Sequence, residues 1–379
     1  MPKPVNILGL IPYKVYPAQM GGQKAIAYFY KYLSAVLPVS IVSMQDNWIP
    51  DSNINEYIPA LSQSRSRYIN PWLFFILKKK IKKGPYSHLC IEHPYFGWLA
   101  ILLKKYTGIQ LIIHSHNIEA LRFKSTGKWW WRLLWWYEKK THQSADVNFF
   151  ITEEDRFYAI EHFRLNPASC HTITYGIEQK KAPSAQERQA ARMQLLQQFH
   201  LPAQHKLLLF NGTLSYRPNL DALNTIIEKI NPLLMAAADF PYTILICGAQ
   251  LPTAYNELIE QRERNIRYAG FVEDINLFYK GADIFINPVM DGGGIKTKLV
   301  EALAHNLTCI STVNGAIGVP ASITNDALQI IPDNNWKLFA AAIVNNAVQT
   351  QGVGQAFFDH FNWEKIARKA AGILNHPSH

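Results

Sequence analysis

The stretch Ile284–Ala304, IFINPVMDGGGIKTKLVEALA, decides how this sequence is interpreted. It combines an apolar strand, a turn of three glycines and a helix that carries Lys296, Lys298 and Glu301. Glycines let backbone N–H groups approach an anion closely, and the N-terminus of the following helix has a partial positive charge. Lysines in the first turns of a helix are unfavourable alone but favourable beside a bound anion. The spacing favours a phosphate site, with a flexible turn and a solvated basic helix face as the alternative.

Short apolar runs alternate with helix-period segments on both sides of this stretch. In the second half the runs are Lys206–Asn211, Tyr242–Cys247, Ile266–Phe271, Ile284–Pro288 and Thr308–Thr312. In the first half they are Val5–Ile11, Val39–Met44, His88–Glu92, Gln110–His114, Val147–Thr152 and His171–Tyr175. Strands that alternate with helices predict parallel βαβ units. We therefore expect an α/β chain of two Rossmann-like, doubly wound lobes that face an interdomain cleft, with ligands at the carboxyl ends of the strands.

The length of 379 residues exceeds what one hydrophobic core usually organises, which also favours two domains. We place the first lobe at residues 1–178 and the second lobe at residues 205–360. Between them, residues 179–204 are polar, with one helical stretch and then a proline. This composition is typical of a connection between lobes.

Composition restricts the class and location of the protein. Four isolated cysteines form no CxxC pair, which indicates core residues in a reducing compartment. The apolar start is too short for a signal peptide, and no run reaches the length of a membrane-spanning helix. The net charge is +10, and residues 1–190 hold 24 Lys+Arg against 13 Asp+Glu. We expect a cytoplasmic protein whose first half meets an anionic partner.

The Ile284–Ala304 stretch resembles the nucleotide-sugar-binding segment of the GT-B glycosyltransferases of the large retaining family 4. It is most similar to members that read PxxxGGGxRxKxxEAxA in place of the usual E-x7-E. Further segments resemble that family in the family's order: Val5–Gly22, His114–Arg122, Ala145–Asp155, Tyr175–Glu178, Phe210–Ala222 and Tyr268–Asp274. The resemblance implies a GT-B fold in which residues 361–379 form a helix that packs back toward the first lobe.

The same resemblance implies an enzyme that moves a hexosyl group from a nucleotide-diphosphate sugar to a glycan or lipid-linked acceptor, with retention. Such enzymes build surface or secreted polysaccharides. By position, Glu301 would hold the donor ribose, and Lys296 and Lys298 would contact the diphosphate. Positive charge where negative charge develops is usually the largest catalytic contribution. The alternatives are a surface glutamate and solvated lysines.

Two departures from the family pattern concern the donor sugar. The first glutamate of E-x7-E would fall at Gly293, and the nearest carboxylate is Asp291. We expect the backbone amides of Gly293 and Gly294 to replace that contact. The usual G-R-L reads Gly212–Leu214 without its arginine, so Arg217 is the candidate phosphate-binding cation.

Candidate residues of the first lobe are Gly21, Gly22 and His116. The two glycines precede a helix and could offer N–H groups to the diphosphate, or could simply form a helix-start turn. His116 matches the family's histidine near the anomeric centre, and a structural hydrogen-bonding group is the alternative. We take Glu119 as structural, because it opens a helix in the family pattern.

These loops contain no Asp-x-Asp motif and no evident His/carboxylate ligand set, so we expect neither a metal nor a cofactor. An NAD-dependent oxidoreductase is disfavoured, because no G-x-G-x-x-G follows Val5–Ile11. A catalytically silent nucleotide-sugar-binding or membrane-associated scaffold and a GT-B sugar-nucleotide epimerase remain as alternatives.

Two segments of the first lobe are both basic and aromatic. Pro71–Lys83 joins an aromatic-aliphatic run to five lysines, and Lys124–Lys140 holds five tryptophans among basic residues. Trp favours the headgroup level of membranes, and Lys and Arg are attracted to anionic lipid. We expect this lobe to dock on the inner face of the cell membrane; the alternative is amphipathic helices that pack on the sheet. Nucleic acid is disfavoured because no recognition motif accompanies the charge.

Overall fold

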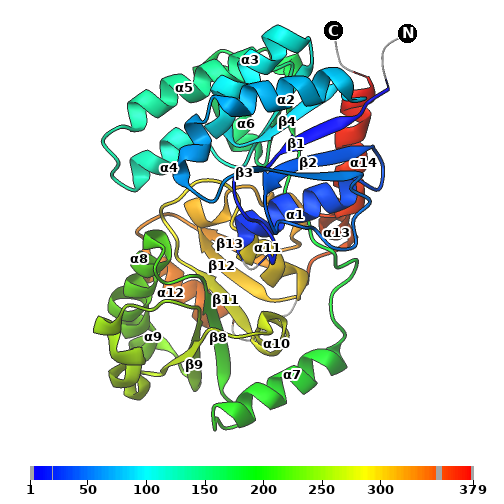
Figure 1. The fold of residues 1–379 in the computed structure, drawn as a ribbon. Helices are drawn as coiled ribbons and strands as arrows, with labels where there is room; N and C mark the ends of the chain where they lie inside the picture. Colours follow the sequence, from blue (N-terminus) through cyan, green and yellow to red (C-terminus); the bar gives the residue numbers. More distant parts are fainter. Residues whose placement is uncertain (1–3, 19, 347–351, 377–379) are drawn as a thin grey trace. The chain divides into compact units, whose positions relative to one another are not determined.

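The structure, a computed structural model, describes residues 4–18, 20–346 and 352–376. The chain divides into two compact units, each built around one sheet (Figure 1). One unit consists of Met1–Glu178, Gly293–Ile295 and His360–His379, and the other of Gln179–Gly292 and Lys296–Asp359.

The first unit contains a seven-stranded sheet in the order β3-β2-β1-β4-β5-β6-β7. Neighbouring strands in this sheet are parallel to each other. The strands are β1 (Ile7–Leu10), β2 (Val39–Met44), β3 (Glu56–Leu61), β4 (His88–Glu92), β5 (Gln110–Ser115), β6 (Val147–Phe150) and β7 (Cys170–Thr172). The central strands are buried on both faces, which is why they read as unbroken apolar runs in the sequence.

Helices join these strands in the parallel, crossover manner that the alternation predicts. They are α1 (Gly21–Leu33), α2 (Trp72–Lys83), α3 (Gly97–Thr107), α4 (Glu119–Ser125), α5 (Trp131–Ser144), α6 (Glu153–Phe163) and the C-terminal α14 (Trp363–Asn375). The inward face of α2 packs with α3 against side chains from β1, β4 and β5 in one apolar cluster. Apolar residues at helical spacing thus cover a sheet whose side chains alternate between its faces.

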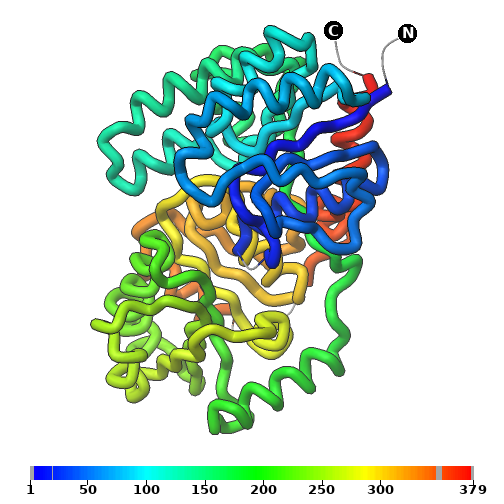
Figure 2. The backbone as a smooth tube through the Cα atoms, in the orientation of Figure 1, coloured from blue at the N-terminus to red at the C-terminus, as the bar shows by residue number. Residues whose placement is uncertain are grey.

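The C-terminal helix α14 packs on α1, at the opposite end of the sequence (Figure 2). The ring of Trp363 stacks on Tyr32 with centroids 6.3 Å apart and an interplanar angle of 11°. Ile177 forms an isolated bridge with Asn362, and Lys31 pairs with Glu178 at 2.9 Å. The chain therefore returns to the first unit for its last helix.

The second unit contains a six-stranded sheet in the order β10-β9-β8-β11-β12-β13, also with parallel pairs. Its strands are β8 (Lys206–Asn211), β9 (Tyr242–Cys247), β10 (Ile266–Gly270), β11 (Ile284–Asn287), β12 (Thr308–Thr312) and β13 (Leu328–Ile331). Its helices are α7 (Ala185–Gln198), α8 (Arg217–Thr225), α9 (Asn231–Ala237), α10 (Ile275–Gly281), α11 (Thr297–Ala304), α12 (Trp336–Asn345) and α13 (Gln355–His360). A π-helical turn, Ile226–Ile230, joins α8 to α9.

The polar segment 179–204 contains α7, which packs on α10 of the second unit. A Cβ atom added at Gly281 would lie 2.6 Å from Leu195 Cδ1, so this glycine permits the close approach of the two helices. The Arg188 guanidinium also donates to the carbonyl oxygens of Asn306 and Ala282 at 2.8 and 3.0 Å. Residues of the expected connection are thus attached to the second unit.

Both parallel sheets that the sequence predicts are present, and each predicted strand overlaps an observed one. The strands that the sequence pattern missed, β3 and β13, lie at the sheet edges. In each sheet the chain order reverses beside the first strand, between β1 and β4 and between β8 and β11. Ligands of open α/β sheets bind outside the carboxyl ends of the strands at such points. In the described part of the chain, no helix has the length and apolarity needed to cross a membrane.

Candidate active site

The glycine turn follows β11 of the second unit and ends at α11. Gly292 and Gly294 have φ angles of 91° and 66°, a left-handed backbone that favours glycine over residues with a Cβ atom. Lys296 is the N-cap of α11, and its Nζ donates to the Gly292 carbonyl oxygen at 2.9 Å. The three glycines and the first lysine therefore form one closed turn at a helix N-terminus.

Lys298 points from α11 toward the end of β8. Its Nζ donates to the Asn211 carbonyl oxygen and to Asn219 Oδ1, both at 3.0 Å, and lies 4.5 Å from the ring centroid of Phe210. Among the described residues, no carboxylate lies within ion-pair distance of this ammonium group. Burial, reinforced by the charge of Lys296, lowers the pKa of Lys298 to about 7. The cation is partly buried among neutral acceptors, an environment in which an added anion would be stabilising.

Glu301 lies about one turn after Lys298 in α11. Tyr279 connects it to Asn211, the last residue of β8. Tyr279 accepts a hydrogen bond from Asn211 Nδ2 at 2.9 Å, and its hydroxyl lies 3.5 Å from Glu301 Oε2. The Glu301 side chain is partly buried. The structure thus brings Lys298 and Glu301 together around Asn211, at the carboxyl end of β8.

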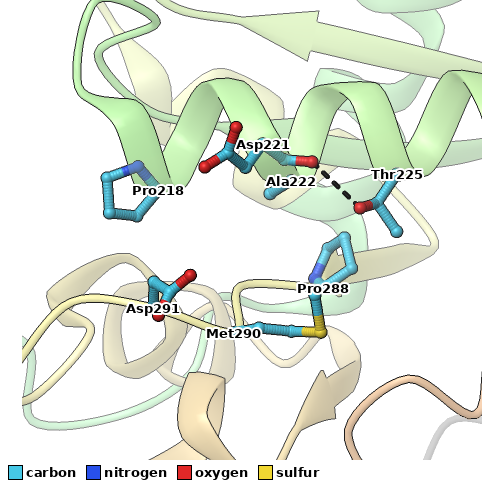
Figure 3. A pocket seen from close by; sticks show the side chains of 7 residues that line it. All are labelled: Pro218, Asp221, Ala222, Thr225, Pro288, Met290 and Asp291. Carbon is cyan, nitrogen blue, oxygen red and sulfur yellow. Dashed lines mark hydrogen bonds between the residues drawn. The ribbon is translucent and has the colours of Figure 1, made fainter. Parts of the chain in front are cut away.

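Arg217 and Asp291 lie apart from that group. Arg217 opens α8, is 77% exposed and pairs with Asp221 at 3.5 Å. Asp291 lines a small surface pocket, where it faces the first turns of α8 (Figure 3). The other lining residues are Pro218, Asp221, Ala222, Thr225, Pro288 and Met290.

The first-unit candidates occupy the carboxyl ends of β1 and β5. Gly21 and Gly22 are the first two residues of α1, where backbone N–H groups have no acceptor within the helix. His116 follows β5 and is 6% exposed. A Cβ atom added at Gly22 would lie 3.9 Å from the Tyr13 hydroxyl. That hydroxyl lies 3.0 Å from His93 Nε2. His93 in turn stacks on His116, with centroids 4.5 Å apart.

A buried carboxylate, Glu92 at the end of β4, holds His116. His116 Nε2 lies 2.7 Å from Glu92 Oε2, and His114 Nδ1 lies 3.1 Å from the same oxygen. Burial would raise the pKa of Glu92, but the two histidines outweigh it and hold this pKa well below its ordinary value. Burial and the charge of His93 lower the pKa of His116 to about 4, so that its imidazole is neutral near pH 7.

A second buried carboxylate, Glu119, is the first residue of α4. It lies 3.1 Å from His93 Nδ1 and accepts hydrogen bonds from Arg122 Nε and the Tyr95 hydroxyl, both at 2.8 Å. The His93 backbone has φ 62° and ψ 165°, a conformation rarely adopted by residues other than glycine. Strained backbone of this kind clusters at functional sites.

The sequence interpretation missed Glu92 and His93. The sequence did contain a signal: a Glu-His pair stands at the end of one predicted strand, and a His-x-His stands at the end of the next. In the structure these strands, β4 and β5, are paired, and Glu92 lies opposite His114. Atoms of Glu92, His114 and His116 lie within 4.8 Å of one another, so this set has the composition to bind a transition metal. In the structure each of the two histidines lies at hydrogen-bond distance from the Glu92 carboxylate. The absence of a metal from the reaction stays a prediction.

Two family profiles match the chain, one on each half. The profile described as "Glycosyltransferase Family 4" matches residues 21–181, and that described as "Glycosyl transferases group 1" matches residues 205–347. A curated relative, an uncharacterized 44.6 kDa protein in the cps region of Klebsiella pneumoniae, is 27% identical over 186 residues. That alignment covers 43% of this chain and 46% of the relative, so the chain matches about half of the relative's length.

Solved structures share the fold at low sequence identity. A glycosyltransferase from Rickettsia africae ESF-5 aligns over 98% of both chains with a TM-score of 0.72 and 16% identity. Anabaena Alr3699/HepE, solved in complex with UDP, aligns over 98% of this chain and all of its own, with a TM-score of 0.70 and 12% identity. The same Anabaena protein has been solved with UDP-glucose. The expected GT-B fold is confirmed, and each half of the chain matches a glycosyltransferase family profile.

Proposed function

We propose that this protein transfers a hexosyl group from a nucleotide-diphosphate sugar to a glycan or lipid-linked acceptor, with retention, as a member of family 4. The observation that carries the proposal is Lys298, a partly buried cation surrounded by neutral acceptors beside a glycine turn and a helix N-terminus. Such a site favours a diphosphate, because cations and helix dipoles together neutralise its charge. The UDP and UDP-glucose complexes of the Anabaena relative support a uridine donor.

In this proposal each donor-binding residue has a separate role. Lys296 and Lys298 contact the diphosphate, and Glu301 accepts hydrogen bonds from the ribose hydroxyls. The amides of Gly293 and Gly294 contact the donor sugar in place of the missing glutamate. Arg217 is a supplementary phosphate ligand that would first leave its ion pair with Asp221.

The first unit contributes Gly21, Gly22 and His116 to the reaction. The N-terminus of α1 donates N–H groups to the diphosphate, and the neutral His116 imidazole hydrogen-bonds near the anomeric carbon. As the bond to phosphate breaks, the lysines stabilise the leaving diphosphate. The acceptor attacks from the same face, and a donor phosphate oxygen takes its proton. No metal and no cofactor take part.

We infer that the acceptor lies at an anionic membrane surface, and that the protein works on the cytoplasmic side. In and before α5, Trp129, Leu133 and Trp136 are 89%, 75% and 58% exposed. In α2, Trp72 and Phe75 are 69% and 60% exposed, and lysines follow them. Aromatic and basic groups on exposed helix faces suit the headgroup region of a bilayer. The relative in a cps region supports a role in polysaccharide biosynthesis.

The test is ligand-dependent thermal stabilisation by UDP, GDP, their glucose conjugates and NAD. A ligand that binds only the native state raises Tm with concentration. We expect a rise with one nucleotide diphosphate that Glu301→Ala removes, whereas Glu228→Ala, an exposed glutamate of the same unit, retains it. Stabilisation by NAD alone, or by no nucleotide, would contradict the proposal. Conversion of the sugar nucleotide without acceptor would identify an epimerase, and donor binding without any turnover a silent binding protein.

A further inference from the structure

We propose that Glu92 is a positioning residue for His116: its carboxylate fixes the imidazole as the Nε2–H tautomer, so that Nδ1 is the nitrogen that meets the substrate. The inference deepens the proposed function, since it rests on His116 acting at the sugar. It concerns a residue outside the donor-binding motif.

The contact between the two side chains is short and shielded from water. Glu92 is 0% exposed and His116 is 6% exposed, with 2.7 Å between Oε2 and Nε2. Glu92 is the last residue of β4, and His116 comes directly after β5. These two strands are paired, with Glu92 opposite His114. Both ends of the hydrogen bond are therefore anchored to the sheet.

Ring contacts hold the His116 imidazole in this orientation. Its centroid is 4.5 Å from that of His93, at an interplanar angle of 29°, and 4.7 Å from that of His114. His114 is itself held by Glu92 and lies 4.4 Å from the ring of Phe29. Rotation of the His116 ring by half a turn would break the hydrogen bond to Glu92 and leave a buried carboxylate with one donor fewer, which is unfavourable.

The chemistry of the carboxylate then decides the tautomer. An ionised carboxylate only accepts hydrogen bonds, so the nitrogen that faces it must carry the proton. A neutral imidazole has one N–H, which leaves a lone pair on Nδ1. Among the described residues, Nδ1 of His116 has no hydrogen-bond partner. It can accept a hydrogen bond from a sugar hydroxyl.

Glu92 acts through His116 and not on the substrate. It is fully buried, and its oxygens are occupied by His114 and His116. The second carboxylate of the cluster, Glu119, lies 3.1 Å from His93 Nδ1 and, in the described part of the chain, makes no hydrogen bond or ion pair with His116. Substitution of Glu119 is therefore a matched control for substitution of Glu92, because both carboxylates are buried.

The experiment is ¹⁵N NMR of the full chain labelled at its histidine rings. The protonated and bare ring nitrogens of a neutral histidine have well-separated shifts, and a His116→Asn sample identifies the signals of this one among 13 histidines. We expect the proton on Nε2 in the native protein. In Glu92→Gln, whose amide can donate or accept, we expect a mixture of tautomers, and in Glu119→Gln the native tautomer. A native Nδ1–H tautomer, or an unchanged His116 signal in Glu92→Gln, would overturn the proposal.

Turnover separates positioning from a merely structural effect. With UDP-glucose, we expect Glu92→Gln to lower kcat at least tenfold with KM changed less than threefold, and Glu92→Asp to recover part of the loss. Equal losses for Glu92→Gln and Glu119→Gln would contradict a specific role of Glu92. UDP-dependent Tm shifts report donor binding independently: if UDP fails to bind the native protein, the proposed function fails while the tautomer assignment stands.

Discussion

The ammonium nitrogen of Lys298 lies 3.0 Å from the carbonyl oxygen of Asn211, which joins the first turn of α11 to the carboxyl end of β8. This contact places a cation beside two neutral acceptors and the ring of Phe210. The charge of Lys296 also disfavours the protonated form of Lys298, so an anion bound here would stabilise both lysines. The protonation of Lys298 and the binding of an anionic ligand should therefore be coupled.

We expect UDP binding to take up a proton above pH 7. The pKa of Lys298 is lowered to about 7, and a bound diphosphate would favour the charged form and raise it again. Affinity should fall between pH 7 and pH 9 in the native protein and less steeply in Lys298→Met. Calorimetric titration in two buffers of different ionisation enthalpy measures the uptake. Lys337→Met, at an exposed lysine of α12, is the control, and a binding enthalpy that does not depend on buffer would contradict the prediction.

The same shift predicts how the ligand-free protein responds to pH. The unfolded chain keeps an ordinary lysine pKa near 10.5, so between pH 7 and 10.5 it binds more protons than the native state does. The free energy of unfolding should therefore gain a contribution that increases with pH across this window. Lys298→Met should lack that contribution, which urea unfolding at pH 7 and pH 9 would detect.

Glu138 on α5 predicts a pH dependence of the opposite sign. Its carboxylate is fully buried and accepts hydrogen bonds from the backbone N–H groups of Glu119 and Ala120, at 2.8 and 2.9 Å. Burial raises the pKa of Glu138 to about 8, so between pH 4.5 and 8 the native state binds more protons than the unfolded chain. Stability from this group should fall as pH rises through that window. Glu138→Gln should be less stable than the native protein at pH 5, with a smaller difference at pH 8; a constant difference would contradict this.

The two faces of α2 should respond differently to substitution. Leu77 is 0% exposed within the apolar cluster, whereas Phe75 is 60% exposed. Leu77→Ala should lower the free energy of unfolding by about 2–5 kcal/mol, because it leaves a cavity. Phe75→Ala should change it by less than about 0.5 kcal/mol. Urea denaturation checks both values, and a large effect of Phe75→Ala would show that this face packs against protein.

The exposed tryptophans predict binding to anionic vesicles. We expect the protein to sediment with phosphatidylglycerol-containing vesicles and to dissociate as salt rises, since exposed charges are screened. Trp129→Ser should lower the bound fraction severalfold. Trp48→Ser is a matched control, because Trp48 is 56% exposed but lies on the connection between β2 and β3. Equal binding of both variants and the native protein would argue against these helices as the docking surface, and salt-insensitive binding against an electrostatic contact.

Local sequence patterns were sufficient to predict the two parallel sheets and the glycine turn before α11. Parallel strands buried on both faces must be apolar throughout, so their positions are visible as runs without any knowledge of their neighbours. The edge strands β3 and β13 lack this signal: Glu56–Leu61 is mostly accessible, and Leu328–Ile331 is only partly buried. Lysines next to glycines were likewise visible as a candidate anion site.

The surroundings of those residues become apparent only in the folded structure. It showed that Lys298 meets Asn211 and Asn219, that Arg217 is paired with Asp221, and that Trp135 packs inward on Tyr158 while Trp136 is exposed. Glu92 and His116 are 24 residues apart in the chain, and only the pairing of β4 with β5 brings them into contact. Strand register and helix packing depend on contacts distant in sequence, and local patterns do not contain them.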